Sequence, residues 1–158
     1  MNAHDILLYG HRTLIGTLEG VPENTWDTPG VCGVWSVKDI LAHLASYEQM
    51  LCDVLTSISD ANAPTTTLQH LLTSEKFNDE QVERRRNQSP AEIRAEYEAA
   101  HAKNMELIQQ IPIEQRRQPG ILSWYGADYD LEDFIVYSFY GHKREHAAQI
   151  AVYKDQLQ

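Results

Sequence analysis

The sequence predicts an all-α protein, a single four-helix bundle over residues 1–158 with an additional short helix between the second and third long helices. Two observations lead to this prediction. Four segments place apolar residues three or four positions apart, the period of an amphipathic helix, and no segment alternates convincingly as a strand does. The chain is also the size of one domain, and its 42% hydrophobic and 23% charged residues are ordinary for a globular protein with a buried core.

The first two long helices have clear boundaries in the sequence. The first is predicted over about residues 2–19 and ends at the turn-rich stretch GVPENTWDTPGVCG. The second begins at Ser36, whose hydroxyl can accept from the backbone N–H of Asp39 while the Asp39 carboxylate reaches back to Ser36, as in a capping box. Its apolar residues then recur every three or four positions until the polar stretch SISDANAPTTT.

The later helices also carry start signals. A shorter helical piece is predicted over residues 68–86. The third long helix opens with Ser89 as N-cap, Pro90 in the first turn and Glu92 at the third helical position. Asp130 is predicted to cap the fourth long helix, which we expect to run to the end of the chain.

The charge balance restricts the partners. Thirteen basic against 23 acidic residues give a net charge of −10, which leaves no basic excess to replace the counterions of nucleic acid or of an anionic membrane. No run approaches the roughly 18 apolar residues of a membrane span, and the N-terminus lacks the pattern of a signal peptide. Cys32 and Cys52 are too few for a disulfide framework. We therefore expect a cytoplasmic protein without nucleic-acid or membrane partners.

Two histidines stand on the core-facing stripe of the fourth helix. His142 and His146 are one turn apart, which places their Cβ atoms about 5–6 Å from one another on the same face. Protonated, the two rings would repel each other, and neutral, each needs partners for two nitrogens in an apolar setting. A divalent metal that uses one lone pair from each ring removes this conflict, so the spacing indicates a metal site.

His43 on the second helix is a third inward-facing candidate. Taken alone, it is more typical of a hydrogen-bonded core histidine than of a ligand. Together with His142 and His146, it would complete a set of three imidazoles and leave one or more coordination positions open, the arrangement of catalytic sites. Imidazole suits several divalent metals, among which we expect zinc or nickel.

The remaining candidates carry weaker signals, and no catalytic residue is assigned. Four histidines are predicted to lie on the surface: His4, His11, His70 and His101. Four aromatic residues are candidates for the wall of a cavity, although each is more typical of ordinary packing: Trp35, Tyr47, Trp124 and Tyr129. Glu145 projects onto a different helical face from His146 and is predicted to be solvated rather than a general base.

The stretch WSVKDILAHLASYEQ, followed about a hundred residues later by HKREHAAQI, resembles the DinB-like superfamily of metal-binding four-helix bundles. The segment KFNDEQVERRRNQSPAEIRAEYEAAHAKNMELIQQIP looks like the middle of the same pattern, so the likeness extends over most of the chain. The resemblance implies that His43, His142 and His146 hold a metal. It also implies relatedness to S-transferases that use bacillithiol, mycothiol or glutathione, and to a mycothiol-dependent maleylpyruvate isomerase.

The resemblance further implies a metal-dependent enzyme that joins a low-molecular-weight thiol to a small electrophile. Asn78 is a candidate substrate contact because an Asn often precedes the third helix in this superfamily, although an exposed helical Asn is the more ordinary interpretation. Two alternatives stay open. One is a non-enzymatic metal-binding or stress-response bundle, which could act as a homodimer, and the other is a hydrolase that uses metal-bound water in a self-protection role.

Overall fold

A computed structural model describes residues 2–157 and confirms the all-α prediction, since the regular elements over this range are helices. Four long helical segments form the bundle: α1 (Ala3–Leu18), α2 (Val37–Ser59), α5 (Pro90–Gln110), and the consecutive elements α7 (Leu131–Ile135), η2 (Val136–Gly141) and α8 (His142–Gln156). Shorter helices connect them: η1 (Glu23–Thr25), α3 (Thr66–Thr73), α4 (Phe77–Arg84) and α6 (Ile113–Arg116). None of the helices within residues 2–157 is long and apolar enough to span a bilayer.

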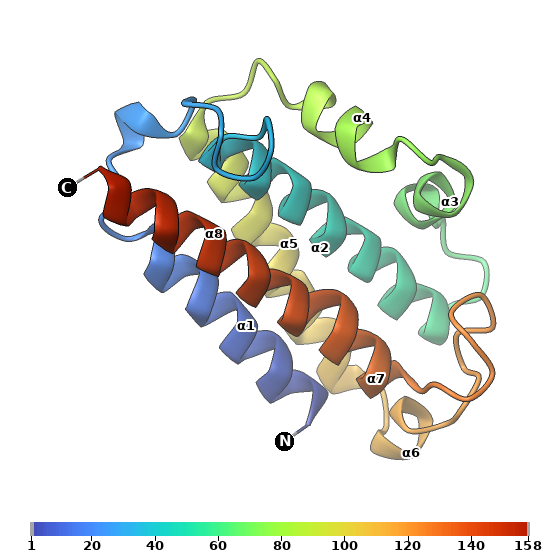
Figure 1. Ribbon diagram of the computed structural model, residues 1–158. Coiled ribbons are helices and arrows are strands. Elements are labelled where there is room, and N and C mark those ends of the chain that lie inside the picture. Colours follow the sequence, from blue (N-terminus) through green and yellow to red (C-terminus); the bar gives the residue numbers. More distant parts are fainter. Residues whose placement is uncertain (1, 158) are drawn as a thin grey trace.

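The long helices pair in two halves. α2 packs chiefly on α5, and α1 packs chiefly on α8, whereas α2 and α8 share few direct contacts. Figure 1 shows α2 and α5 running in one direction and α1 and α8 in the other. Because α2 and α5 are parallel, the chain between them needs a long return connection, which α3 and α4 provide along the outer side of α2.

The predicted helix starts are confirmed. The backbone N–H of Asp39 donates to Ser36 Oγ at 3.1 Å, and the Ser36 N–H donates to Asp39 Oδ2 at 3.0 Å, so α2 begins with a complete capping box. Ser89 forms the equivalent box at the start of α5, and Asp130 forms one at the start of α7. These caps satisfy backbone donors that the first helical turn leaves without partners.

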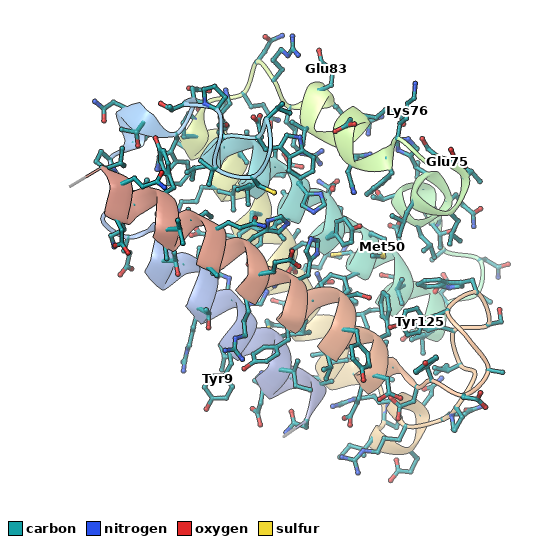
Figure 2. All side chains as sticks on the ribbon, in the orientation of Figure 1. Tyr9, Met50, Glu75, Lys76, Glu83 and Tyr125 are labelled. Atoms are coloured by element: carbon teal, nitrogen blue, oxygen red, sulfur yellow. The ribbon has the colours of Figure 1, made fainter. Side chains whose placement is uncertain are left out.

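The segment predicted as one short helix over residues 68–86 is two helices. The chain at Ser74 is extended (φ −116°, ψ 116°), which separates α3 from α4. Asp53 on α2 caps the start of α3 from outside, because its Oδ2 accepts from the backbone N–H groups of Thr67 at 2.7 Å and Leu68 at 3.0 Å. Figure 2 shows Lys76 and Glu83 on the outer side of this segment, pointing away from the bundle.

The fourth long helix is not a uniform α-helix. Residues Val136–Gly141 form a π-helix between α7 and α8. A π turn accommodates an extra residue and is frequent at functional sites. Here it directly precedes His142, so it sets the direction in which α8 presents its histidines. Sequence periodicity did not reveal this change.

The core consists of two apolar clusters separated by a polar layer. One cluster includes Leu7, Leu51 and Phe139, and the other includes Leu14 and Leu41. Between them, each long helix contributes polar side chains. We define the polar layer by these residues: His11, Glu48, His101, Asn104 and Lys143.

The polar layer corrects two predictions about histidines. His101, expected on the surface, is buried at 5% exposure, and His11 is half-buried and stacks on it with ring centroids 4.0 Å apart. The surface prediction for His101 rests on its charged neighbours in the sequence, and that for His11 rests on its position off the main apolar row of the first helix. The polar layer provides those side chains with buried partners, so polar neighbours in the sequence do not indicate exposure here.

The capping box of α2 generates a prediction about stability. Ser36→Ala removes one side of the box, so we expect the free energy of unfolding to fall by about 1 kcal/mol and Tm to fall by about 2–4 °C. Thermal and urea unfolding followed by circular dichroism measure this loss. Ser59→Ala, at the exposed end of the same helix, is the matched control and should leave Tm nearly unchanged. Equal effects of the two substitutions would contradict the assigned role of the cap.

Candidate metal centre

The structure brings together the three histidines singled out by the sequence, here called the histidine cluster: His43, His142 and His146. The Nε2 atoms of His43 and His142 lie 2.8 Å apart, and those of His142 and His146 lie 3.0 Å apart. One nitrogen from each ring lies within 4.8 Å of the others, and the rings of His43 and His146 are buried. The first turns of α8 therefore face the N-terminal third of α2.

Hydrogen bonds on α8 fix which nitrogen of each ring carries its proton. His146 Nδ1–H donates to Gln149 Oε1 at 2.8 Å. The His142 ring is hydrogen-bonded to the backbone of Ser138, and since its Nε2 faces the cluster, its Nδ1–H makes this bond. With both protons on Nδ1, the two Nε2 atoms are left with lone pairs that face each other.

This donor set fits a divalent cation. Two lone pairs held 3.0 Å apart without a proton between them repel each other. A metal that accepts both, with a third nitrogen from His43, converts this repulsion into coordination, and three imidazoles are an established ligand set for zinc. The partners Gln149 and Ser138 then act as the outer hydrogen-bond acceptors that metal-ligating histidines almost always have.

The rings of the cluster are poor proton acceptors. Burial, followed by the proximity of His142 and His146, lowers the pKa of His43 to about 2. Burial and the neighbouring His146 lower the pKa of His142 to about 4, although the hydrogen bond to Ser138 opposes this change. Burial also lowers the pKa of His146. Neutral imidazoles are the form that binds metals, so the cluster is kept in its ligating state at neutral pH.

Two of the four predicted aromatic residues surround the cluster. The rings of Trp35 and Tyr47 lie with centroids 4.9 Å and 4.8 Å from that of His43, and Tyr47 also lies 4.7 Å from the ring of His142. Burial raises the pKa of the Tyr47 hydroxyl. These rings restrict the orientation of the imidazoles and lower the polarity around them.

The other two aromatic candidates are placed elsewhere. Trp124 packs edge-on against Phe134, with ring centroids 5.3 Å apart, and Tyr129 is 47% exposed in the loop before α7. Neither belongs to the aromatic surroundings of the cluster. Glu145 is exposed, as expected from its position on α8.

Asn78 lies on the exposed side of α4. The preceding residue, Phe77, is the one that turns inward, and its ring packs edge-on against Tyr47 with centroids 5.9 Å apart. α4 thus borders the surroundings of the cluster through Phe77, and a role of Asn78 in substrate binding stays a prediction.

Sequence reasoning missed the residues that support the cluster. Gln149 stands three positions after His146, a spacing that places the two side chains side by side on a helix. This spacing could have indicated that Gln149 is the hydrogen-bond partner of His146. The ion pair between Lys143 and Glu48 joins residues 95 positions apart, so no local pattern indicates it. Burial alone would raise the pKa of Glu48, but the Lys143 ammonium and His101 bring it down to about 2.

The lowered pKa values predict that the metal-free protein loses stability in acid. In the unfolded chain the imidazoles have their ordinary pKa of 6.5, so they bind protons below that pH while His142 and His43 in the folded protein stay neutral to about pH 4 and about pH 2. Proton uptake then favours the unfolded state between these limits. Between pH 7.5 and pH 5 we expect a loss of about 2 kcal/mol per imidazole, measured by urea unfolding in the presence of a chelator.

A double substitution tests the source of this acid sensitivity. His43→Gln combined with His142→Gln should make the unfolding free energy of the metal-free protein clearly less dependent on pH. His4→Gln, a change on α1 outside the cluster, is the control and should retain the full dependence. An unchanged pH dependence in the double variant would show that the cluster does not titrate as its burial requires.

Comparison with known proteins places the chain in a family. The family model described as the mycothiol maleylpyruvate isomerase N-terminal domain matches residues 7–130. This range includes His43 but ends before His142 and His146, so the position of those two histidines relative to His43 comes from the structure. None of the curated proteins compared shows significant sequence similarity to the chain.

Two crystal structures have a similar fold. A structural-genomics protein from Streptococcus pneumoniae superimposes with a TM-score of 0.74 at 14% identity, over 98% of this chain and 91% of that protein. A histidine-to-alanine mutant of the mycothiol-dependent maleylpyruvate isomerase gives a TM-score of 0.74 at 13% identity. That superposition covers 94% of this chain but 59% of the isomerase. From the family match and the shared fold, the chain belongs to the DinB-like superfamily, in the family of the mycothiol maleylpyruvate isomerase N-terminal domain.

Proposed function

We propose that this protein is a metal-dependent enzyme that transfers a low-molecular-weight thiol to a small electrophile. The observation that carries the proposal is the convergence of the Nε2 atoms of His43, His142 and His146, with the protons of the last two rings held on the opposite nitrogens. Membership of a family named after a mycothiol-linked domain supports the choice of a thiol as cosubstrate.

In this proposal the three histidines hold a divalent cation, zinc or nickel. Such a cation supplies Lewis-acid chemistry and lowers the pKa of a thiol that reaches it. The chemical outcome is an S–C bond between the thiol sulfur and a carbon of the electrophile, while the thiol loses its proton and the carbon loses its leaving group with the bonding electrons. An activated alkene or an epoxide would take up the sulfur without a separate leaving group.

The side chains around the cluster have definite roles in this scheme. Gln149 and Ser138 orient the imidazoles of α8 by accepting their Nδ1 protons. Trp35 and Tyr47 pack against the rings and exclude water from them, which strengthens electrostatic interactions at the site. We do not assign a general base, and the candidate contact of Asn78 with the substrate is part of the proposal.

The same geometry supports a second function, a metal-binding bundle without turnover. His43 is 2% exposed, His146 is 6% exposed and His142 is half-buried, so the cluster offers only a small open surface to a substrate. A closed site of this kind suits storage or structural binding of a metal better than rapid exchange of small molecules. The two functions differ in whether a thiol reaches the metal.

Metal content is the first test. The purified protein should contain close to one zinc or nickel ion per chain by elemental analysis, because three converging neutral imidazoles bind such ions strongly. His142→Ala combined with His146→Ala should abolish this content, while His4→Ala should leave it unchanged. Protein without metal, or full metal content in the double variant, would refute the metal centre.

Activity with thiols is the second test. Metal-loaded protein is incubated with bacillithiol, mycothiol or glutathione and with monochlorobimane or an epoxide, and formation of the thioether is followed by fluorescence or mass spectrometry. We expect at least one thiol to react faster than with the chelator-treated protein. If metal is bound but no thiol in the panel reacts above that control, the result favours the bundle without turnover.

A further inference from the structure

The cluster joins two helices that otherwise touch little. His43 belongs to α2 and His142 and His146 to α8, and these helices pack mainly on α5 and α1, respectively. The two apolar clusters lie toward opposite ends of the bundle and make non-directional contacts, which tolerate small shifts along a helix axis. A shift of α8 by a fraction of a turn would separate His142 from His43. Some other interaction must therefore fix the axial position of α8 relative to α2, here called its height.

Lys143 is placed to provide that interaction. It follows His142 directly in α8, and its side chain is 2% exposed. Its ammonium pairs with Oε1 of Glu48 on α2, five residues or about 7.5 Å along the helix from His43. The ion pair thus connects the same two helices as the metal site, close to the same level of the bundle.

The three other long helices all lie against the Lys143 side chain. The ammonium lies 5.5 Å from the ring centroid of Tyr97 on α5. The stem passes α1 at Gly10, where a Cβ atom would stand 3.5 Å from Lys143 Cδ and 3.4 Å from the backbone of Tyr140. Gly10 thus places α1 next to the stem, with room at this position for no more than a methyl group in ordinary van der Waals contact.

Glu48 is held in place independently of Lys143. Asn104 on α5 donates from Nδ2 both to Glu48 Oε2 and to the Glu48 backbone carbonyl, each at 2.8 Å. His101 Nδ1 lies 3.5 Å from the same carboxylate oxygen. Residues of α5 thus fix the Glu48 carboxylate through Oε2. The position of the remaining oxygen, Oε1, then determines where the Lys143 ammonium must lie.

We infer that the buried ion pair between Lys143 and Glu48 is a positioning device for the metal site, which fixes the height of α8 on α2 and so brings His142 and His146 to His43. This inference rests on the proposed metal centre and extends it to residues that do not touch the metal. Buried ion pairs contribute little net stability, because the desolvation of both charges offsets their attraction. They do require one geometry, since a displaced partner leaves a charge buried and unpaired.

The test replaces both charges at once. Glu48→Gln combined with Lys143→Met removes the ion pair without leaving an unpaired charge, and it preserves an oxygen acceptor for Asn104. We expect the variant to keep its helical circular dichroism while its dissociation constant for Zn²⁺, measured by competition with a chromophoric chelator, rises about 10- to 100-fold. The visible absorption of the Co²⁺-substituted protein should also change, which a loss of stability alone would not cause.

A second ion pair, partly buried, is the matched control. Arg85, 4% exposed, pairs with Glu96 of α5 at 2.6 Å, and its other side-chain hydrogen bonds go to Gln49 and Gln81, which lie outside α8 and the histidine cluster. Arg85→Met combined with Glu96→Gln removes a comparable interaction. Its Zn²⁺ dissociation constant and Co²⁺ spectrum should match those of the unsubstituted protein.

The outcomes separate this inference from the proposed function. If the unsubstituted protein binds no metal, the metal centre and the inference both fail. If it binds metal and the folded double variant binds with the same affinity and spectrum, the inference alone is wrong. Should the double variant not fold, Lys143→Met alone decides, since it removes the contact with α8 while Glu48 keeps its hydrogen bonds from Asn104 and can take up a proton in place of the lost ammonium. Weaker Zn²⁺ binding in this folded variant supports the inference, and unchanged binding overturns it.

Discussion

A layer of buried polar side chains crosses the middle of the bundle, and each of its members needs a partner on another helix. A buried polar group without a hydrogen bond is strongly unfavourable, whereas an apolar side chain can exchange one neighbour for another. The contacts of Asn104 with both the side chain and the backbone of Glu48 show how specific the layer is. The apolar clusters above and below it supply most of the burial, and the polar layer determines the register.

The histidine cluster depends on that register because its ligands come from the two halves of the bundle. His43 belongs to the half formed by α2 and α5, and His142 and His146 belong to the half formed by α1 and α8. A site within one helix could form in isolation, but this one exists only when the halves are assembled. The π-helix before α8 adds a second local constraint, since it changes the angle at which the chain enters His142.

Much of the fold could be predicted from the sequence because its signals are local. The capping boxes at Ser36 and Ser89 lie within four residues, and the spacing of His142 and His146 is one helical turn. The π-helix could not be predicted, since its residues have no composition that distinguishes them from an α-helix. The candidate ligands of the site could therefore be predicted from the sequence, whereas the π-helical backbone next to them could not.

The burial of Lys143 and His101 was unpredictable for a different reason. A lysine or histidine with polar neighbours is normally exposed, and the exception depends on a partner far away in the sequence. Buried Lys143 is stabilised by its ion pair with Glu48, and buried Glu48 is stabilised by the hydrogen bond from Asn104. Each of the three side chains can therefore be buried only when the other two are in place. Pairs of this kind are a property of the assembled bundle.

The hydrogen bonds of Gln149 and Ser138 connect the stability of the metal-free protein with its affinity for metal. By holding both Nδ1 protons, they point the Nε2 lone pairs of His142 and His146 at each other, an arrangement that is unfavourable without a cation. The same bonds remove the reorientation of the rings that metal binding would otherwise require. The hydrogen bonds that destabilise the centre of the metal-free bundle are thus the ones that prepare it to bind a metal. Metal binding in turn stabilises the contact between α2 and α8, on which the site itself depends.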